Sequence, residues 1–151
     1  MKSVDIIADI LNDKPQLNVD FIYCIEQEKA ADSLAYILTV SDYLKAGEIP
    51  EESRKDIADS TLTGYLLSKP FAASLPADSE LEILYRNYIG IDNLNTRLDS
   101  LKRSQSGFLA SYLSIDRAIP PERFRIIETT PDSIISVKKY PSFRIYFTAG
   151  E

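Results

Sequence analysis

The chain has 151 residues, of which 44% are hydrophobic, so a single domain can bury a core without disulfides or metals to hold it. Its 17 basic and 23 acidic residues give a net charge of −6, which argues against a nucleic-acid partner because such affinity comes largely from neutralised phosphates. The single cysteine, Cys24, excludes an internal disulfide, and no apolar run approaches the roughly 18 residues of a membrane-spanning helix. We therefore expect one globular domain over residues 1–151, without a membrane span.

The first expected elements are a short helix and a strand. Apolar residues recur at helical spacing over residues 4–11, after Ser3 as a favourable N-cap. Pro15 ends this helix because it forces the preceding residue out of the α region. Residues 16–25 then alternate as in a β-strand. In the second half of this strand the opposite face is also apolar, because it carries Ile22 and Cys24. This predicts that other elements cover both faces of the strand there.

A second helix is expected over residues 27–47, with Gly47 as its C-terminal stop. Its buried side would hold Ala31, Leu34, Ala35, Leu38 and Leu44. Residues 48–79 contain three prolines and one short helical pattern at residues 53–58, but no sustained period. We expect an irregular insertion there, on one edge of the domain.

The longest periodic segment follows this insertion. A helix begins near residues 78–79, breaks at Gly90, and continues to Ile115 before Pro120 and Pro121 stop it. A core-facing helix is favoured over a coiled coil, which needs a sustained seam with charged flanks. The predicted core-facing seam alternates intervals of three and four residues: Ile91, Leu94, Leu98, Leu101, Gln105, Phe108, Tyr112 and Ile115.

Two strands are expected at the end of the chain, over residues 123–128 and 142–148, after a turn at residues 129–132. The last strand alternates Phe143, Ile145 and Phe147 with Arg144 and Tyr146. The order is thus helix, strand, helix, insertion, long helix, strand, strand. This order predicts an α+β or α/β fold with a mixed sheet.

Three segments carry a resemblance to a known family: "ADILNDKPQLNVDFIYCI", "FLASYLSIDRAIPPERFRI" and "SFRIYFT". They resemble the OmpA-like fold, and more narrowly its divergent version at the C-terminal end of large AsmA-like bacterial envelope proteins of unknown function. The resemblance spans roughly residues 6–148. It implies an α/β sandwich of the α+β class, with helices packed on one face of a mixed sheet and an irregular insertion at about residues 48–79.

The OmpA-like fold is expected to open with a strand before its first helix, and this chain has no room for that strand. A missing strand would leave one edge of the sheet open, and an open edge favours pairing with another chain. We therefore expect a tendency to form a homodimer through the sheet edge.

Family members that bind peptidoglycan hold its diaminopimelate with an Asp after the first covered strand and an Arg on the following long helix. An amino-acid zwitterion needs such an anion for its ammonium and a guanidinium for its carboxylate. The resemblance places Glu26 and Gln105 at these two positions, so any peptidoglycan site here would have altered ligands. These departures argue against peptidoglycan binding. By itself, Gln105 is interpreted as a hydrogen-bonded amide within an apolar stripe.

Catalytic chemistry finds little support in the sequence. The chain has no histidine, which removes the usual general base and the commonest metal ligand. Its five glycines are too far apart for a phosphate-binding loop. Cys24 lies mid-strand among apolar neighbours and is interpreted as an inert core thiol. We expect no catalytic residue, no metal and no cofactor.

The function expected from the resemblance is a non-catalytic interaction or anchoring module in the periplasm, binding protein partners in the envelope as part of a membrane-anchored AsmA-like protein. One alternative is a peptidoglycan-binding domain with altered ligands at Glu26 and Gln105. Another is a cytosolic adaptor or regulatory domain. The candidate partner surface lies in the insertion, at apolar residues expected to be exposed: Leu62, Tyr65, Leu66, Leu67 and Phe71.

Overall fold

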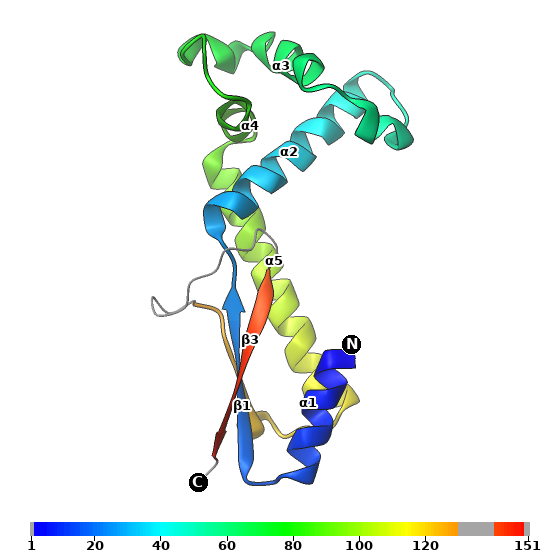
Figure 1. The fold of residues 1–151 in the computed structure, drawn as a ribbon, viewed down its shortest axis with the longest axis vertical. Coiled ribbons are helices and arrows are strands. Elements are labelled where there is room, and N and C mark those ends of the chain that lie inside the picture. The colour runs from blue at the N-terminus through cyan, green and yellow to red at the C-terminus, as the bar shows by residue number, and fades with distance from the viewer. Residues whose placement is uncertain (1, 130–140, 150–151) are drawn as a thin grey trace. The chain divides into compact units, whose positions relative to one another are not determined.

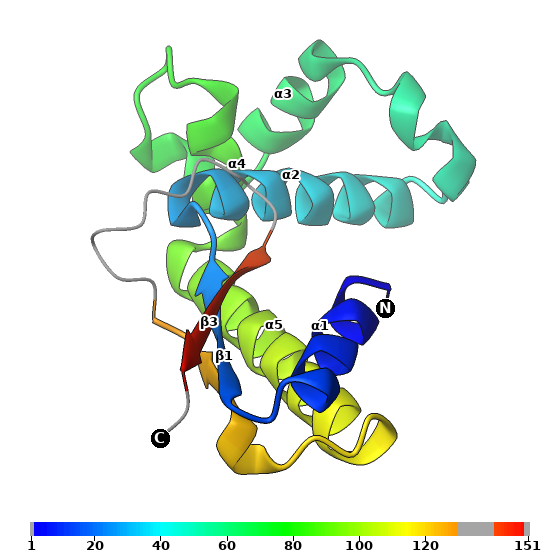
Figure 2. The same cartoon turned by 60° about the horizontal axis from the view of Figure 1, so that its bottom comes forward.

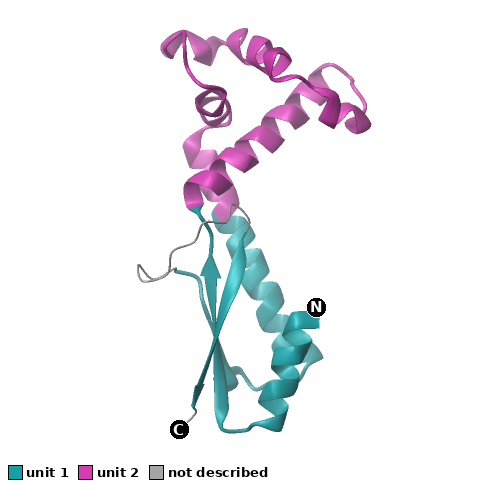
Figure 3. Ribbon diagram, in the orientation of Figure 1, with its two compact units in different colours: residues 1–26, 99–151 teal, residues 27–98 magenta. Residues whose placement is uncertain are grey.

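A computed structural model describes residues 2–129 and 141–149. It combines helices with a three-stranded mixed sheet, which confirms the predicted α+β class (Figure 1). The chain divides into two compact units, one formed by residues 1–26 and 99–151 and the other by residues 27–98 (Figure 3). The predicted turn at residues 129–132 falls largely outside the described residues.

The first unit contains the sheet. Its strands are β1 (Leu17–Cys24), β2 (Phe124–Ile127) and β3 (Ser142–Ala149), in the order β2-β1-β3. β1 runs parallel to β2 and antiparallel to β3. The helical elements of this unit are α1 (Lys2–Asp13), the later part of α5 (Ile91–Ser111), the π-helical turn η3 (Tyr112–Asp116) and the short 3-10 helix η4 (Pro121–Arg123).

The register of the sheet assigns its faces. Val19 lies opposite Phe124 and Phe147, and Phe21 lies opposite Ile126 and Ile145. The face with these residues packs against α1 and α5, which both lie on the same side of the sheet (Figure 2). This arrangement agrees with the expectation that helices cover one face. The buried core of the unit comprises Ile7, Ala8, Leu11, Val19, Phe21, Leu109, Leu113 and Ile119.

The second half of β1 is buried on both faces, as predicted. Ile22 and Cys24 are buried although they point away from the face of Val19 and Phe21. The helix before the strand differs in one detail from the expectation, because α1 already begins at Lys2 and Ser3 therefore lies inside it. Its end at Asp13 agrees with the stop predicted from Pro15.

The second unit is helical. It contains α2 (Gln27–Ala46), the 3-10 helices η1 (Glu51–Asp56) and η2 (Pro70–Ser74), α3 (Asp59–Leu67), α4 (Leu81–Ile89) and the start of α5. Residues 48–79 therefore form a series of short helices, and the irregular insertion predicted there is wrong in its local structure. α3 packs against both α2 and α4, and these tertiary contacts hold helical pieces that have no periodic pattern of their own.

Gly90 separates α4 from α5, as predicted from the sequence. Its φ of 94° lies in the left-handed region, which glycine adopts without the penalty of a Cβ atom. The predicted seam of α5 is only partly correct, because Leu94 and Leu98 are buried but Leu101 and Phe108 are exposed. In the first unit the buried positions of this stretch are instead Ser106, Leu109 and Leu113. A strict heptad spacing drifts around a straight helix by about 20° per heptad, so it does not stay on one face.

Among the described residues, no helix combines the length and the apolar character that crossing a bilayer requires.

Candidate functional site

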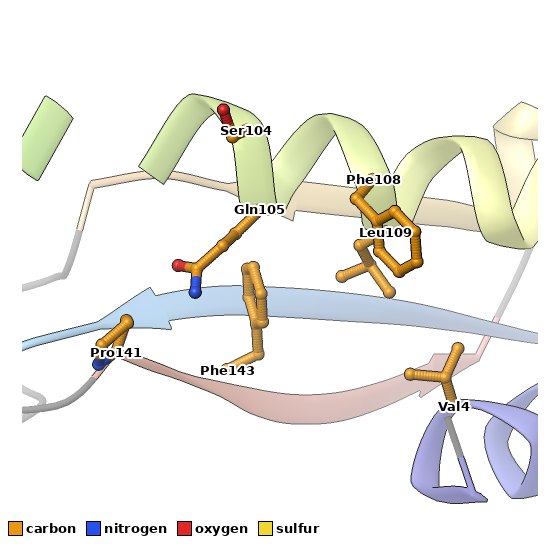
Figure 4. Close-up of a pocket in the computed structure, with 7 residues that line it drawn as sticks. All are labelled: Val4, Ser104, Gln105, Phe108, Leu109, Pro141 and Phe143. Carbon is orange, nitrogen blue, oxygen red and sulfur yellow. The ribbon is translucent and has the colours of Figure 1, made fainter. Parts of the chain in front are cut away.

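A pocket of about 370 Å³ opens in the first unit, between α1, α5 and the beginning of β3 (Figure 4). Its lining comes from three segments that are far apart in the sequence. They contribute Val4 from α1, Ser104, Gln105, Phe108 and Leu109 from α5, Pro141 from just before β3, and Phe143 from β3 itself.

The lining of this pocket is mainly apolar. Its two polar residues are Ser104 and Gln105, and neither side chain ionises near neutral pH. Figure 4 shows Phe108 and Leu109 reaching from α5 toward the strands, with the amide of Gln105 close to Phe143. Such a lining suits an apolar group with one or two hydrogen-bonding atoms, and it offers no acid or base to a reaction.

Gln105 is held in place by the sheet. The hydroxyl of Tyr23 on β1 donates a hydrogen bond to Oε1 of Gln105 at 3.1 Å. Burial, and then the charge of Glu128, raises the pKa of Tyr23, so its hydroxyl keeps its proton through the neutral range. The amide is therefore hydrogen-bonded, as the sequence interpretation of a polar residue in an apolar stripe expected.

Phe108 forms the exposed rim of the pocket. Its side chain is 61% exposed and stacks on Tyr112, with ring centroids 6.4 Å apart and an interplanar angle of 18°. Tyr112 in turn donates a hydrogen bond to Asp5 of α1, and this bond raises the pKa of the tyrosine. Arg117 adds an ion pair to Asp9 at 2.5 Å. These polar contacts fix the region around the rim to α1, although Phe108 itself is open to solvent.

β3 continues the apolar surface beyond the pocket. Three consecutive residues of this strand, Ile145, Tyr146 and Phe147, are exposed. Among the described strands β3 lies at the edge of the sheet and pairs with β1 alone. Successive side chains of a strand point to opposite faces, so Ile145 and Phe147 share the face of Phe143, which lines the pocket, whereas Tyr146 lies on the other face.

The resemblance suggested two residues for peptidoglycan binding, and one of them, Gln105, is among the residues that line the pocket. Gln105 lines the pocket, whereas Glu26 lies two residues beyond the end of β1 and is not among the described lining residues. Glu26 is half-buried, and it does have interactions with its surroundings. The described lining of the pocket therefore contains no carboxylate that could bind the ammonium group of diaminopimelate.

The partner surface predicted in residues 48–79 requires correction. Leu62 and Leu66 are fully buried, because α3 packs them into the helical unit against α2 and α4. Tyr65 and Phe71 are half-buried and form ring contacts with the tyrosines of that unit. Only Leu67, with 50% of its side chain exposed, remains as predicted.

Two further expectations concern reactive groups. Cys24 is buried, with its Sγ donating to the carbonyl oxygen of Ile22 at 3.4 Å, as expected for a core thiol. Across residues 2–129 and 141–149, no three side chains of His, Cys, Asp or Glu come together as a set of metal ligands.

Sequence reasoning missed the pocket. The spacing of apolar residues predicts Phe108 in the buried seam, whereas its side chain is exposed. Val4 and Phe143 line the same pocket because of tertiary structure that no local pattern contains. A usable signal is present in the last strand, which carries a single charge, Arg144, and three large apolar side chains on one face, although edge strands normally carry more protective charges.

Comparison with known proteins adds no assignment, because no protein-family model, no curated protein and no solved structure matches this chain.

Proposed function

We propose that this chain is a non-catalytic interaction module, and that its binding surface is the pocket together with the exposed edge of β3. The observation that carries this proposal is an apolar pocket of about 370 Å³ whose rim, Phe108, is 61% exposed. Soluble domains rarely leave a contiguous apolar surface uncovered unless it binds something.

The chemistry of the lining supports binding over catalysis. A partner would insert an apolar side chain beside Phe143 and Leu109, with Ser104 and Gln105 available for hydrogen bonds at the mouth. The chain has no histidine, and the lining has no ionisable side chain that could act as a general acid or base.

The setting of the proposed module is the bacterial envelope. Its support is the resemblance of the helix-to-strand segments to the OmpA-like end of AsmA-like proteins. In that setting the module lies in the periplasm, as part of a parent protein tethered in the inner membrane, and it binds a protein partner of the envelope.

Site-specific photo-crosslinking in the native cells tests this proposal. A benzophenone amino acid replaces Phe108 in one variant and Leu67 in a matched variant, since both side chains are exposed and apolar but belong to different units. We expect a defined protein adduct from position 108 only. An adduct from position 67 alone would instead favour the surface in residues 48–79.

The identity of the adduct tests the setting. An envelope protein captured at position 108 supports the periplasmic module. Capture of cytosolic proteins alone would contradict it and favour a cytosolic adaptor or regulatory domain.

A second candidate is peptidoglycan binding with altered ligands, and the position of Gln105 in the pocket is the observation that favours it. An NMR titration of the labelled protein with soluble muropeptides that contain diaminopimelate tests this candidate. Saturable shifts at Gln105 and Glu26 would support it. Unchanged amides at millimolar ligand would exclude it and leave the protein partner.

A further inference from the structure

We propose that a second copy of this chain covers the edge of β3, so that two sheets join through antiparallel pairing of β3 with its copy. This inference rests on the proposed function, because it names the partner of one part of the same surface. Its basis is the strand itself, whose side-chain pattern is complementary to its own when the strand is turned by a two-fold axis.

β3 is long and apolar for an edge strand. It runs over eight residues, and its sequence SFRIYFTA carries a single charge, Arg144, and no internal proline or lysine. Edge strands that stay unpaired are normally short or interrupted by charges, prolines or bulges. Arg144 is the single charge that protects this strand, so its outer edge is suited to pairing with another strand.

The register with β1 shows which side chains would meet at such a pairing. Phe143, Ile145 and Phe147 lie opposite Tyr23, Phe21 and Val19, so they share the face that packs on the helices. On this face Ile145 and Phe147 are still 39% and 40% exposed. Because β3 lies at the edge of the described sheet, a further strand beside it would add cover to both side chains.

A two-fold axis perpendicular to the sheet at Ile145 pairs like faces of the two strands. Ile145 then lies opposite its own copy, Phe143 lies opposite Phe147 of the second copy, and Arg144 lies opposite Tyr146 of the second copy. Aromatic and branched side chains are thus matched on the helix side. On the other side a guanidinium faces an aromatic ring, which is a favourable contact.

The charges agree with this arrangement. The only charged residue of the strand does not meet its own copy, so the repulsion of like charges across a strand pair is avoided. A pairing shifted by one residue on each strand, centred on Tyr146, would put Phe143 opposite Ala149 and lose the two aromatic pairs. We therefore place Ile145 at the axis.

Disulfide trapping tests both the pairing and its register. Three variants are compared, Ile145→Cys, Tyr146→Cys and the control Ile115→Cys, whose side chain is 76% exposed and lies outside the sheet. In the proposed dimer the two Cα atoms at position 145 are about 5 Å apart, within the range that a disulfide spans. The native Cys24 is buried and is present in all three variants, so any disulfide that it forms contributes equally to each of them.

We expect mild oxidation to convert Ile145→Cys to a covalent dimer at least tenfold faster than Ile115→Cys. Faster trapping of Tyr146→Cys would contradict the axis at Ile145. Equal, slow rates at all three positions would overturn the pairing itself.

Sedimentation velocity of the native chain supplies a measurement without new cysteines. The weight-average mass should rise above the 17.0 kDa of one chain with increasing concentration, and Ile145→Lys should abolish the rise. The matched variant Leu67→Lys, with an exposed apolar residue of the other unit, should behave as the native chain. A native chain that stays at 17.0 kDa at all concentrations would overturn the dimer. If the crosslinker at position 108 still captured a protein in cells, the proposed function would stand without the dimer.

Discussion

The hydroxyl of Tyr23 donates a hydrogen bond to the side-chain oxygen of Gln105, joining two residues that are 82 positions apart. It connects β1 to the helix that lines the pocket, and it holds one of the two polar residues of the lining. The wall of the proposed binding surface is therefore fixed to the sheet before any partner arrives.

The contribution of this bond can be measured by a double-mutant cycle with Tyr23→Phe and Gln105→Leu. We expect the two changes to couple by about 1 kcal/mol in the free energy of unfolding, the usual net value of a partly buried hydrogen bond. Urea denaturation of the four proteins gives the coupling. Fully additive changes would show that the bond does not stabilise the fold.

Arg123 fastens the turn between α1 and β1. Its guanidinium donates hydrogen bonds to the carbonyl oxygens of Leu11, Lys14 and Leu17, at 2.9, 3.1 and 2.6 Å for one of its nitrogens. We expect Arg123→Ala to lower the free energy of unfolding by about 2 kcal/mol, because several carbonyls lose a charged donor at once. Arg123→Lys should recover only part of this loss, since one ammonium lacks the planar fork.

The control for Arg123 is Arg97→Ala. Arg97 is exposed on α5 and bonds only to Asn93 among the contacts described, so its removal should change stability by less than about 0.5 kcal/mol. Equal losses for the two alanine variants would contradict the role given to Arg123.

The buried face of α5 can be tested by truncating side chains on its two sides. We expect Leu113→Ala, just beyond the helix, to cost about 3 kcal/mol because the side chain is fully buried in the core of the first unit. Leu101→Ala should cost much less, because Leu101 is exposed. Chemical denaturation measures the free energy of unfolding of both variants and of the native chain. A larger loss for Leu101 would restore the seam predicted from the sequence.

Stability should fall at alkaline pH because of Tyr85. Burial, then the charge of Asp59 and the neighbours Tyr36 and Glu82, raises the pKa of Tyr85 to about 12 from the ordinary value of 10.0. The unfolded chain releases this proton first, so the contribution is complete below pH 10 and is lost as the pH rises toward 12.

Tyr85→Phe tests this pH dependence. The variant should lose stability less steeply than the native chain between pH 10 and pH 12, while the same comparison at pH 7 sets the baseline. Thermal unfolding followed by circular dichroism gives both slopes. Identical slopes would show that Tyr85 does not titrate differently in the folded state.

Much of the element order could be predicted because its signals are local. Pro15 and Gly90 act through their own backbones, and α1 ends and α4 gives way to α5 beside them as expected. The stop predicted from Pro120 and Pro121 comes earlier, because α5 ends at Ser111 and its π-helical turn at Asp116. The alternation of the strands likewise predicted which residues of β1 and β3 share a face.

The errors came from features that depend on tertiary contacts. The lack of a sustained period in residues 48–79 predicts that Leu62 and Leu66 are exposed, yet both are buried in α3, which packs against neighbouring helices. The pocket brings together Val4, Phe108 and Phe143, and no spacing along the chain predicts which of them stays uncovered. Burial of a helix face is decided by the surfaces it meets, which a local pattern does not contain.

The measurement that tests the central claim most directly is residue-resolved amide hydrogen exchange along β3, by NMR at low and high protein concentration. The central claim is that this strand's edge is a binding surface covered by a second copy. Amides that point to β1 should be slow at both concentrations, while the alternate amides of residues 142–149 should become slow only at high concentration. Alternate amides that exchange equally fast at every concentration would contradict the account.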